Sequence, residues 1–532
     1  MKTKSAFIFW SLIGFITTAN LVVFDYIVLS SQDNIRVQFT PDDAYYYLQL
    51  AKNFVKYGYW TFDSKVSLAS GFHPLLAYLL AVIYKVALPS TEEFVTIDIL
   101  LSSIPILVLV FFVWLKSVLS RNGNFLIAIS LFAGAQSFLF NSVSGVEWSF
   151  VVVLAALYCS VYIHSSRSTS ASLKLFTVGL FLSLARSGAG LLPFSIFIAG
   201  VFFTILGDEE NKLALRNSFI GLVGAFSGVG LGFINNYVFT GNIIQSSAKM
   251  KLYWGGFQEN LLFKSIIIAL RTIGFDLYFI SFSTLCIPLL FIIVIICLLF
   301  LVSRGREFMD ILRKTSSKGG KTNNQSVLYF ASIVCVVGYF VLYSRGGGGL
   351  QNWYTANFLV PMFVLFDALI NLLISRVSFK RGTTETALSL IILVTILVNI
   401  LSVYPIPDRA PWQHQQVMLA AGKYLNKNHF DGKIASWNAG IIGYYQGGQV
   451  INIDGLVNES IYPYAVGNEL PVYLKQENIL YVIDFQTMLI PVYRKRGGYD
   501  DPVFLENLIP VARFDDGQFP VWQFLTLYRI RY

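Results

Sequence analysis

The chain has 532 residues, of which 55% are hydrophobic and only 13% are charged, and its mean hydropathy is +0.61. This composition is typical of a protein embedded in a lipid bilayer and excludes an ordinary soluble enzyme. The net charge of +9 does not indicate a nucleic-acid partner, because no soluble basic domain contains the charges and many of them lie in short loops between apolar segments.

Apolar runs define the predicted membrane spans. The first, from Ala6 to about Leu29, is longer than a signal-peptide core and lacks a small-residue cleavage site, so we interpret it as a retained span. Segment 173–206 is too long for one span and is interrupted at 186–190, which predicts two short helices that meet at one membrane face. The other runs of sufficient length are 97–119, 124–141, 147–164, 216–239, 272–302, 326–343, 353–375 and 386–404. Together they predict an all-α polytopic protein with about 11 transmembrane helices.

Basic residues in the loop 304–321 place that loop in the cytoplasm and orient the rest of the chain. The amino terminus is then inside and the carboxyl terminus outside. The apolar stretch 74–88 is short for a crossing, and we expect it to form a juxtamembrane or re-entrant helix on the outer side. Residues 1–404 are thus predicted to form a transmembrane module whose external loop, 31–96, contains most of the unusual polar groups.

The tail, residues 405–532, begins with a proline-rich linker and then changes to mixed polar and apolar sequence with glycine-rich turns. Short β-rich runs at 433–437, 449–453 and 479–485 accompany a helical stretch at 417–426. This pattern predicts a small soluble α/β or α+β domain on the extracytoplasmic side.

Two adjacent acids, Asp42 and Asp43, follow the first span in a loop rich in tyrosine. They could simply stabilise a helix start, with Thr40 as the N-cap and Pro41 at the first helical position. Paired acids in a chain with few charges are also candidates for binding or proton transfer.

The same loop contains aromatic, hydroxyl and imidazole groups, which we interpret as a sugar-binding surface together with the acids. A sugar ring offers apolar faces for stacking and hydroxyls for carboxylates, so Tyr46, Trp60 and His73 are candidate substrate contacts.

Glu147 and Arg186 are candidates at the outer ends of spans. Glu147 either faces water at a helix start or is a further acid facing Asp42 and Asp43. Because Arg186 interrupts an apolar stretch, it needs either a structural partner such as Glu147 or an anionic ligand.

Three further cations lie in predicted external loops. Lys249 and Lys251 either contact lipid headgroups or bind the phosphate of a lipid substrate. Arg345 precedes four glycines, whose backbone N–H groups form either a plain tight turn or an anion nest. The sequence lacks a P-loop, a dinucleotide fingerprint, HExxH, paired CxxC and GxSxG motifs, so nothing in it supports nucleotide-driven transport.

The external loop resembles that of bacterial membrane glycosyltransferases of the GT-C fold, including the arabinofuranosyltransferase-like and mannosyltransferase-like groups. The resemblance covers most of the chain, but only the loop motif is specific. One departure is Arg186-Ser187-Gly188-Ala189-Gly190 where relatives often have Arg-Pro-Glu-Gly, so the acid contact at that turn cannot be transferred. The similar segments are 42–53 with Gly58, 71–75, 144–147, Arg186, 236–237 with Gly241 and Lys249, Tyr354 near Pro361, 440–444 and 454–457.

The resemblance implies an inverting transfer of a sugar from a polyprenyl-phosphate donor to a cell-envelope glycan, lipid or protein acceptor at the outer face of the bacterial inner membrane. Asp43 or Asp42 would be the base, Glu147 would orient a substrate, and Lys249 or Arg186 would hold phosphate. Tyr354 is a further implied substrate contact. Relatives with monosaccharide-lipid donors resemble metal-independent catalysts, whereas the oligosaccharyltransferase branch uses a divalent ion. We therefore assign no cofactor, although the sequence does not decide between the two.

Two other functions remain open. A lipid-linked glycan flippase or transporter would also be an aromatic-rich membrane protein, but its ionisable groups should lie near mid-membrane on broken helices. A structural or assembly protein would use the tail as a binding module and would leave the paired acids as a helix cap.

Overall fold

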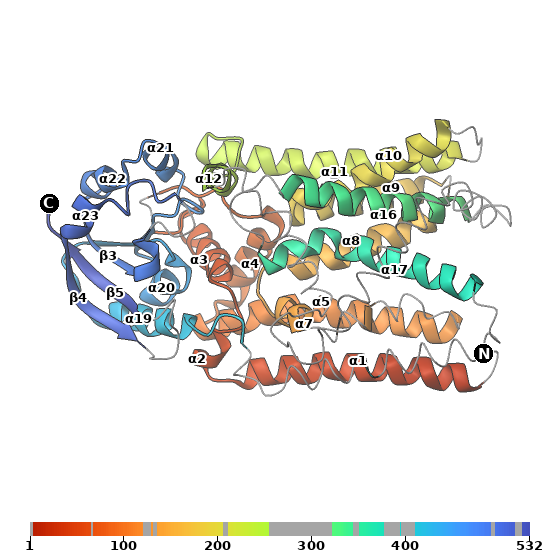
Figure 1. Cartoon of the computed structure of the whole chain (residues 1–532), viewed down its shortest axis with the longest axis horizontal. Helices are drawn as coiled ribbons and strands as arrows, with labels where there is room; N and C mark the ends of the chain where they lie inside the picture. The colour runs from red at the N-terminus through yellow and green to blue at the C-terminus, as the bar shows by residue number, and fades with distance from the viewer. Residues whose placement is uncertain are drawn as a thin grey trace.

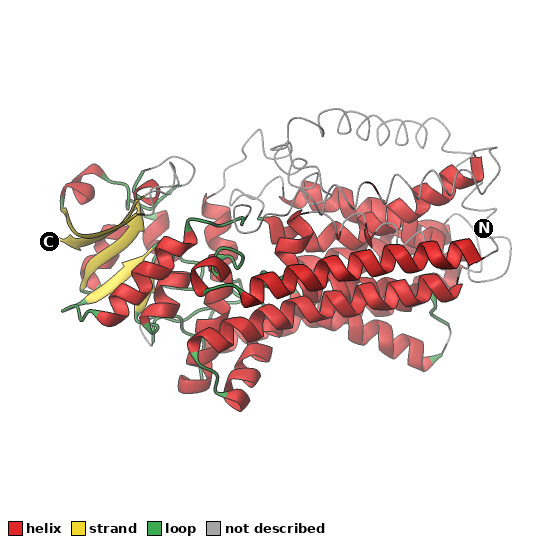
Figure 2. Ribbon diagram, turned by 90° about the horizontal axis from the view of Figure 1, so that it is seen from below, coloured by secondary structure: helices red, strands yellow, loops and turns green. Residues whose placement is uncertain are grey.

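The computed structural model describes residues 4–64, 67–120, 129–130, 133, 136–166, 168–205, 211–254, 322–343, 351–376, 394, 410–490, 495–515 and 524–532. Long helices run side by side along one direction, and a small sheet-containing domain caps one end of them (Figures 1 and 2). The predicted span 272–302 lies outside the described residues, and so does 386–404 apart from residue 394. Of 124–141, only a part is described.

Long apolar helices form the body of the molecule. Four segments within the described ranges are long and apolar enough to cross a membrane, namely Trp10–Ser30, Thr91–Leu119, Ser187–Ile205 and Lys212–Thr240. The predicted number of about 11 spans is therefore not reached by the described helices alone. The helices of the body are α1 Lys4–Ser30, α5 Thr91–Ser120, α7 Gln136–Ser142, α8 Trp148–Ile163, α9 Thr169–Ala185, α10 Leu191–Ile205, α11 Asn211–Thr240, α16 Thr322–Tyr343 and α17 Ala356–Arg376.

Glycines bring α9 and α11 into close contact. A Cβ atom at Gly224 would lie 2.2 Å from the carbonyl oxygen of Phe176, and one at Gly228 would lie 2.3 Å from that of Leu180. The two backbones therefore touch, as small residues allow in membrane helices. This contact fixes the end of α9, where Arg186 lies.

Short helices lie between the body and the capping domain (Figure 1). They are α2 Asp33–Arg36, α3 Asp42–Tyr57, α4 Pro74–Ala87 and α12 Ser246–Trp254. The predicted helix at 74–88 is confirmed as α4, which begins with proline at its first position, where a missing N–H costs nothing.

The predicted N-cap of α3 is wrong by one residue. The helix begins at Asp42 with Pro41 as its N-cap residue, and no side chain caps it. The Thr40 hydroxyl is instead 2.9 Å from that of Tyr45, which is buried with it.

The C-terminal domain contains one mixed sheet of five strands in the order β2-β1-β3-β5-β4. Strand β1 is parallel to β2 and β3, whereas β5 is antiparallel to β3 and β4. The predicted strands and helix are confirmed, and two strands that the sequence analysis missed complete the sheet. The elements are α19 Gln415–Lys427, β1 Lys433–Ser436, α20 Ala439–Gln446, β2 Val450–Asn452, α21 Ile461–Val466, α22 Leu470–Gln476, β3 Ile479–Phe485, α23 Pro502–Glu506, β4 Leu508–Asp515 and β5 Phe524–Ile530.

Candidate active site

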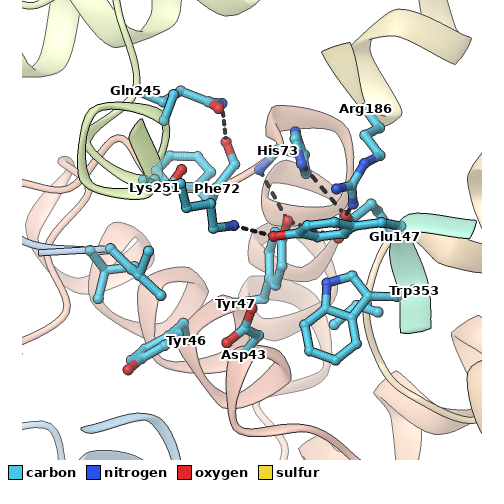
Figure 3. Close-up of a pocket in the computed structure, with 17 residues that line it drawn as sticks. Asp43, Tyr46, Tyr47, Phe72, His73, Glu147, Arg186, Gln245, Lys251 and Trp353 are labelled. Carbon is cyan, nitrogen blue, oxygen red and sulfur yellow. Dashed lines mark hydrogen bonds and ion pairs between the residues drawn. The ribbon is translucent and has the colours of Figure 1, made fainter. Parts of the chain in front are cut away.

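A cavity of about 190 Å³ lies where the helical body meets the C-terminal domain. Its walls come from α3, the segment before α4, the turn before α8, the break after α9, α12, the 3₁₀ turn Asn352–Thr355 and the tail segment 456–457. Segments far apart in the sequence therefore build one site (Figure 3). Seven predicted site residues line it: Asp43, Tyr46, His73, Glu147, Arg186, Lys251 and Tyr354.

Glu147 is the centre of a buried polar cluster. The turn before it contains Gly145 at φ +68°, a conformation that glycine adopts readily, and the carboxyl of Asp98 lies against that glycine. Although Glu147 is the N-cap residue of α8, its side chain does not cap the helix. It forms an ion pair with Arg186 and accepts a hydrogen bond from the Tyr47 hydroxyl at 3.0 Å. Glu147 is therefore buried rather than facing water at a helix start, and Arg186 has the structural partner that was one of its two alternatives.

His73 adds the third contact to this carboxylate, with its Nε2 3.5 Å from Oε1. Burial lowers the pKa of His73 to about 4, so the imidazole is neutral near pH 7. Burial of Glu147 opposes its ionisation, but the ion pair with the buried guanidinium of Arg186 offsets this cost. The carboxylate is therefore charged, and Arg186 carries its counter-charge.

Two cations share the ring of Tyr354. The Arg186 guanidinium lies 4.2 Å from the ring centroid, and the ammonium of Lys251 lies 5.0 Å from it and also contacts the hydroxyl. Burial works against the charge of Lys251, but Tyr354 and Asp43 more than offset this and raise its pKa. The site thus holds two positive groups against the same aromatic ring, and this arrangement suits an anion such as phosphate.

Asp43 lies in the first turn of α3 and lines the cavity, below Tyr47 in Figure 3 and away from Arg186. The site therefore contains an acid on one side and cations on the other. A sugar attached to a phosphate could lie between them, with its reacting carbon near the acid.

Asp42 contacts the C-terminal domain. Its carboxylate accepts hydrogen bonds from the backbone N–H groups of Gly440, at 3.2 Å, and Ile441, at 2.7 Å, in the first turn of α20. Burial raises the pKa of Asp42 to about 7. The two acids thus have different surroundings: of the pair, Asp43 lines the cavity, whereas Asp42 binds the start of α20.

Two predicted contacts lie outside the cavity. Trp60 is fully buried and stacks on Phe54, with ring centroids 4.0 Å apart. Lys249 pairs with Glu459 at 3.3 Å. Packing and a charge partner account for both positions, so the structure brings neither to the site. Arg345 lies outside the described residues.

Several lining residues were missed by the sequence analysis. Tyr47 stands in the tyrosine run, and its contacts with Glu147 and with the backbone N–H of His73 distinguish it from its neighbours. Trp353 precedes Tyr354, and Gln245 precedes α12 by one residue. Leu456 and Val457 belong to the tail segment 454–457, which the sequence analysis noted as similar to the GT-C glycosyltransferases. No local sequence pattern could predict that this segment packs against the loop 71–73.

Asp454 is a further missed residue near this site. It is 4% exposed, and its carboxylate accepts the backbone N–H of Leu456 at 2.7 Å. Burial raises its pKa to about 8, and Asp43 and Asp42 add to the increase. Even with these acids, the described residues contain no group of three or more His, Cys, Asp or Glu that could hold a metal ion.

Comparisons with solved structures show which known proteins this architecture resembles. ArnT from Cupriavidus metallidurans bound to undecaprenyl phosphate is similar with a TM-score of 0.53 and 10% identity, over 97% of each chain. The Archaeoglobus fulgidus oligosaccharyltransferase tethered with an acceptor peptide has a TM-score of 0.53 and 12% identity, over 99% of this chain and 74% of that chain. This chain has the GT-C fold. The resemblance noted in the external loop is confirmed at the level of fold.

The GT-C fold does not by itself show what the chain acts on, because these solved structures share little sequence with it. A family model described as a domain of unknown function, DUF8728, matches residues 407–526. No curated protein sequence matches the chain significantly.

Proposed function

We propose that this protein is an inverting glycosyltransferase. It moves a sugar from a polyprenyl-phosphate donor to a cell-envelope glycan, lipid or protein acceptor on the outer face of the bacterial inner membrane, where the C-terminal domain also lies. The observation that carries the proposal is the opposition, within one cavity, of Asp43 to the cations Arg186 and Lys251.

The solved neighbours support the donor class. One is a complex with undecaprenyl phosphate, and the other holds an acceptor peptide. The cavity lies at one end of the long apolar helices, where a lipid tail can remain in the bilayer while its phosphate reaches Lys251 and Arg186.

The proposed reaction is a single displacement. The acceptor hydroxyl oxygen attacks the anomeric carbon as Asp43 takes the hydroxyl proton. The bond between that carbon and the phosphate oxygen breaks, and its electron pair leaves with the polyprenyl phosphate. Arg186 and Lys251 stabilise the charge that develops on the phosphate. Because one attack occurs from the face opposite the leaving group, the configuration inverts. The leaving phosphate needs no general acid, unlike the alkoxide of a glycosidase reaction.

The Glu147 cluster has a supporting role. Glu147, with Tyr47 and His73, fixes the guanidinium of Arg186 before the substrate arrives, so little reorganisation is needed at the moment of reaction.

The proposal is tested with the purified full-length protein in bilayer nanodiscs. A panel of polyprenyl-phosphate monosaccharides is incubated with envelope acceptors, and products are identified by mass spectrometry and by the anomeric configuration in NMR spectra. We expect one donor to be consumed and its sugar to appear on an acceptor with inverted configuration. Retained configuration, or movement of the lipid-linked sugar across proteoliposome membranes without any transfer, would overturn the proposal.

A further inference from the structure

The two lysines of α12 point to different partners. Lys251 lines the cavity and contacts Tyr354, whereas Lys249 lies outside it and pairs with Glu459 of the C-terminal domain. The two residues are separated by one position, so they project from different sides of the helix. Lys249 therefore holds α12 while Lys251 faces the site.

Glu459, in the tail, contacts three other segments: the external loop, helix α12 and the turn before α12. Its carboxylate accepts hydrogen bonds from the Ser70 hydroxyl of the external loop and from Lys249 at 3.3 Å, and lies 3.4 Å from the side-chain nitrogen of Asn242. Its backbone N–H donates to the carbonyl of Leu68 at 2.9 Å. The side chain is 9% exposed, so water competes little for these contacts.

The same segments also fix the first residue of α12. The backbone N–H of Ser246 donates to the Ser70 hydroxyl at 3.0 Å, and its own hydroxyl donates to the carbonyl of Leu456 at 2.8 Å. The helix is thus fastened at Ser246 and at Lys249, and Lys251 follows within the next turn.

We propose that Glu459 is a positioning residue through which the C-terminal domain holds α12 and sets Lys251 against the donor phosphate. The proposal rests on the proposed function, because it names a determinant of donor binding at the same site. It gives the domain a part in recognition of the lipid phosphate, although Glu459 itself does not line the cavity.

The test measures binding of undecaprenyl phosphate to full-length protein in nanodiscs, for wild type and for Glu459→Gln. Glutamine retains the shape and an acceptor oxygen for Ser70, so the change removes mainly the charge. We expect the Kd for undecaprenyl phosphate to increase about tenfold, as is usual for coupling between sites. The KM for the donor should rise by a similar factor while kcat changes less. Lys249→Met, which removes the other member of the pair, should have the same effect.

Charge reversal separates positioning from simple destabilisation. The double variant Glu459→Lys with Lys249→Glu restores an ion pair and should bring the Kd to within about threefold of wild type. Glu477→Gln is the matched control, because Glu477 pairs with Lys433 in the same domain at 3.0 Å but at an exposed position. It should leave the Kd unchanged.

Wild-type affinity in Glu459→Gln and Lys249→Met, or a loss that the charge reversal does not restore, would overturn this inference and leave the proposed function intact. A wild-type protein that binds no undecaprenyl phosphate would overturn the proposed function and this inference together.

Discussion

Asp42 and Asp43 are neighbours in sequence with different surroundings. Asp43 lines the cavity opposite Lys251 and Arg186, whereas the Asp42 carboxylate binds the N–H groups at the start of α20. The sequence analysis treated the two as alternatives for the base, because local sequence does not show which way each side chain points. Only the position of α20, about 400 residues later, distinguishes them.

The two acids should therefore respond differently to replacement by asparagine. Asp43→Asn removes the proposed base and should lower kcat at least 100-fold, the range expected for general-base catalysis, with an unchanged Tm. Asp42→Asn places an amide N–H against the Gly440 N–H and should lower stability by about 1–2 kcal/mol, with a smaller loss of kcat.

Steady-state kinetics and thermal unfolding of both variants in nanodiscs provide the test. Full transfer activity in Asp43→Asn would remove the assignment of the base.

At the scale of elements, hydropathy was sufficient to predict the long helices, the break at Arg186 and the short helix α4. The alternation of residues predicted three strands of the C-terminal sheet but not β4, where Pro510 interrupts the pattern, or β5. It could not predict that the tail segment 456–457 packs against the external loop, because this contact joins segments with no shared local pattern. The contact depends on Gly71, where a Cβ atom would lie 1.5 Å from the carbonyl oxygen of Leu456.

Gly71→Ala should accordingly force this tail segment away from the loop. We expect a loss of about 1–3 kcal/mol in stability, as is typical of overpacking, together with weaker donor binding. Gly232→Ala is the matched control, because no atom lies within 4 Å of the position its Cβ would take. Thermal unfolding and undecaprenyl phosphate binding should distinguish the two variants, and equal behaviour would show that the contact does not matter.

At the scale of the whole molecule, several buried carboxyl groups lie in the C-terminal domain or at its junction with the body. Burial raises the pKa of Asp42 and Asp484 to about 7 and that of Asp454 to about 8. Sequence alone could not predict these values, because they result from burial, which depends on how segments distant in the chain pack together. Each group retains its proton in the folded protein at pH values where the unfolded chain has lost it, so the free energy of unfolding falls as pH rises from about 4 toward these values.

Removing one such group should flatten this dependence. Asp454→Asn keeps an acceptor oxygen for the Leu456 N–H and cannot ionise, so its stability should fall less between pH 5 and pH 8. The slope should differ from wild type by up to about 1.4 kcal/mol per pH unit, the effect of one proton. Chemical denaturation across this range measures the difference, and parallel curves would contradict the raised pKa of Asp454.

The central claim is that the cavity between the body and the C-terminal domain holds a lipid phosphate between cations and the base. Its most direct test is a cryo-electron microscopy structure of the full-length protein in nanodiscs saturated with undecaprenyl phosphate. We predict phosphate density within about 4 Å of the nitrogen atoms of Lys251 and Arg186, ion-pair distance, with the isoprenoid chain leading toward the apolar helices. Phosphate density at another site with this cavity empty would contradict the claim.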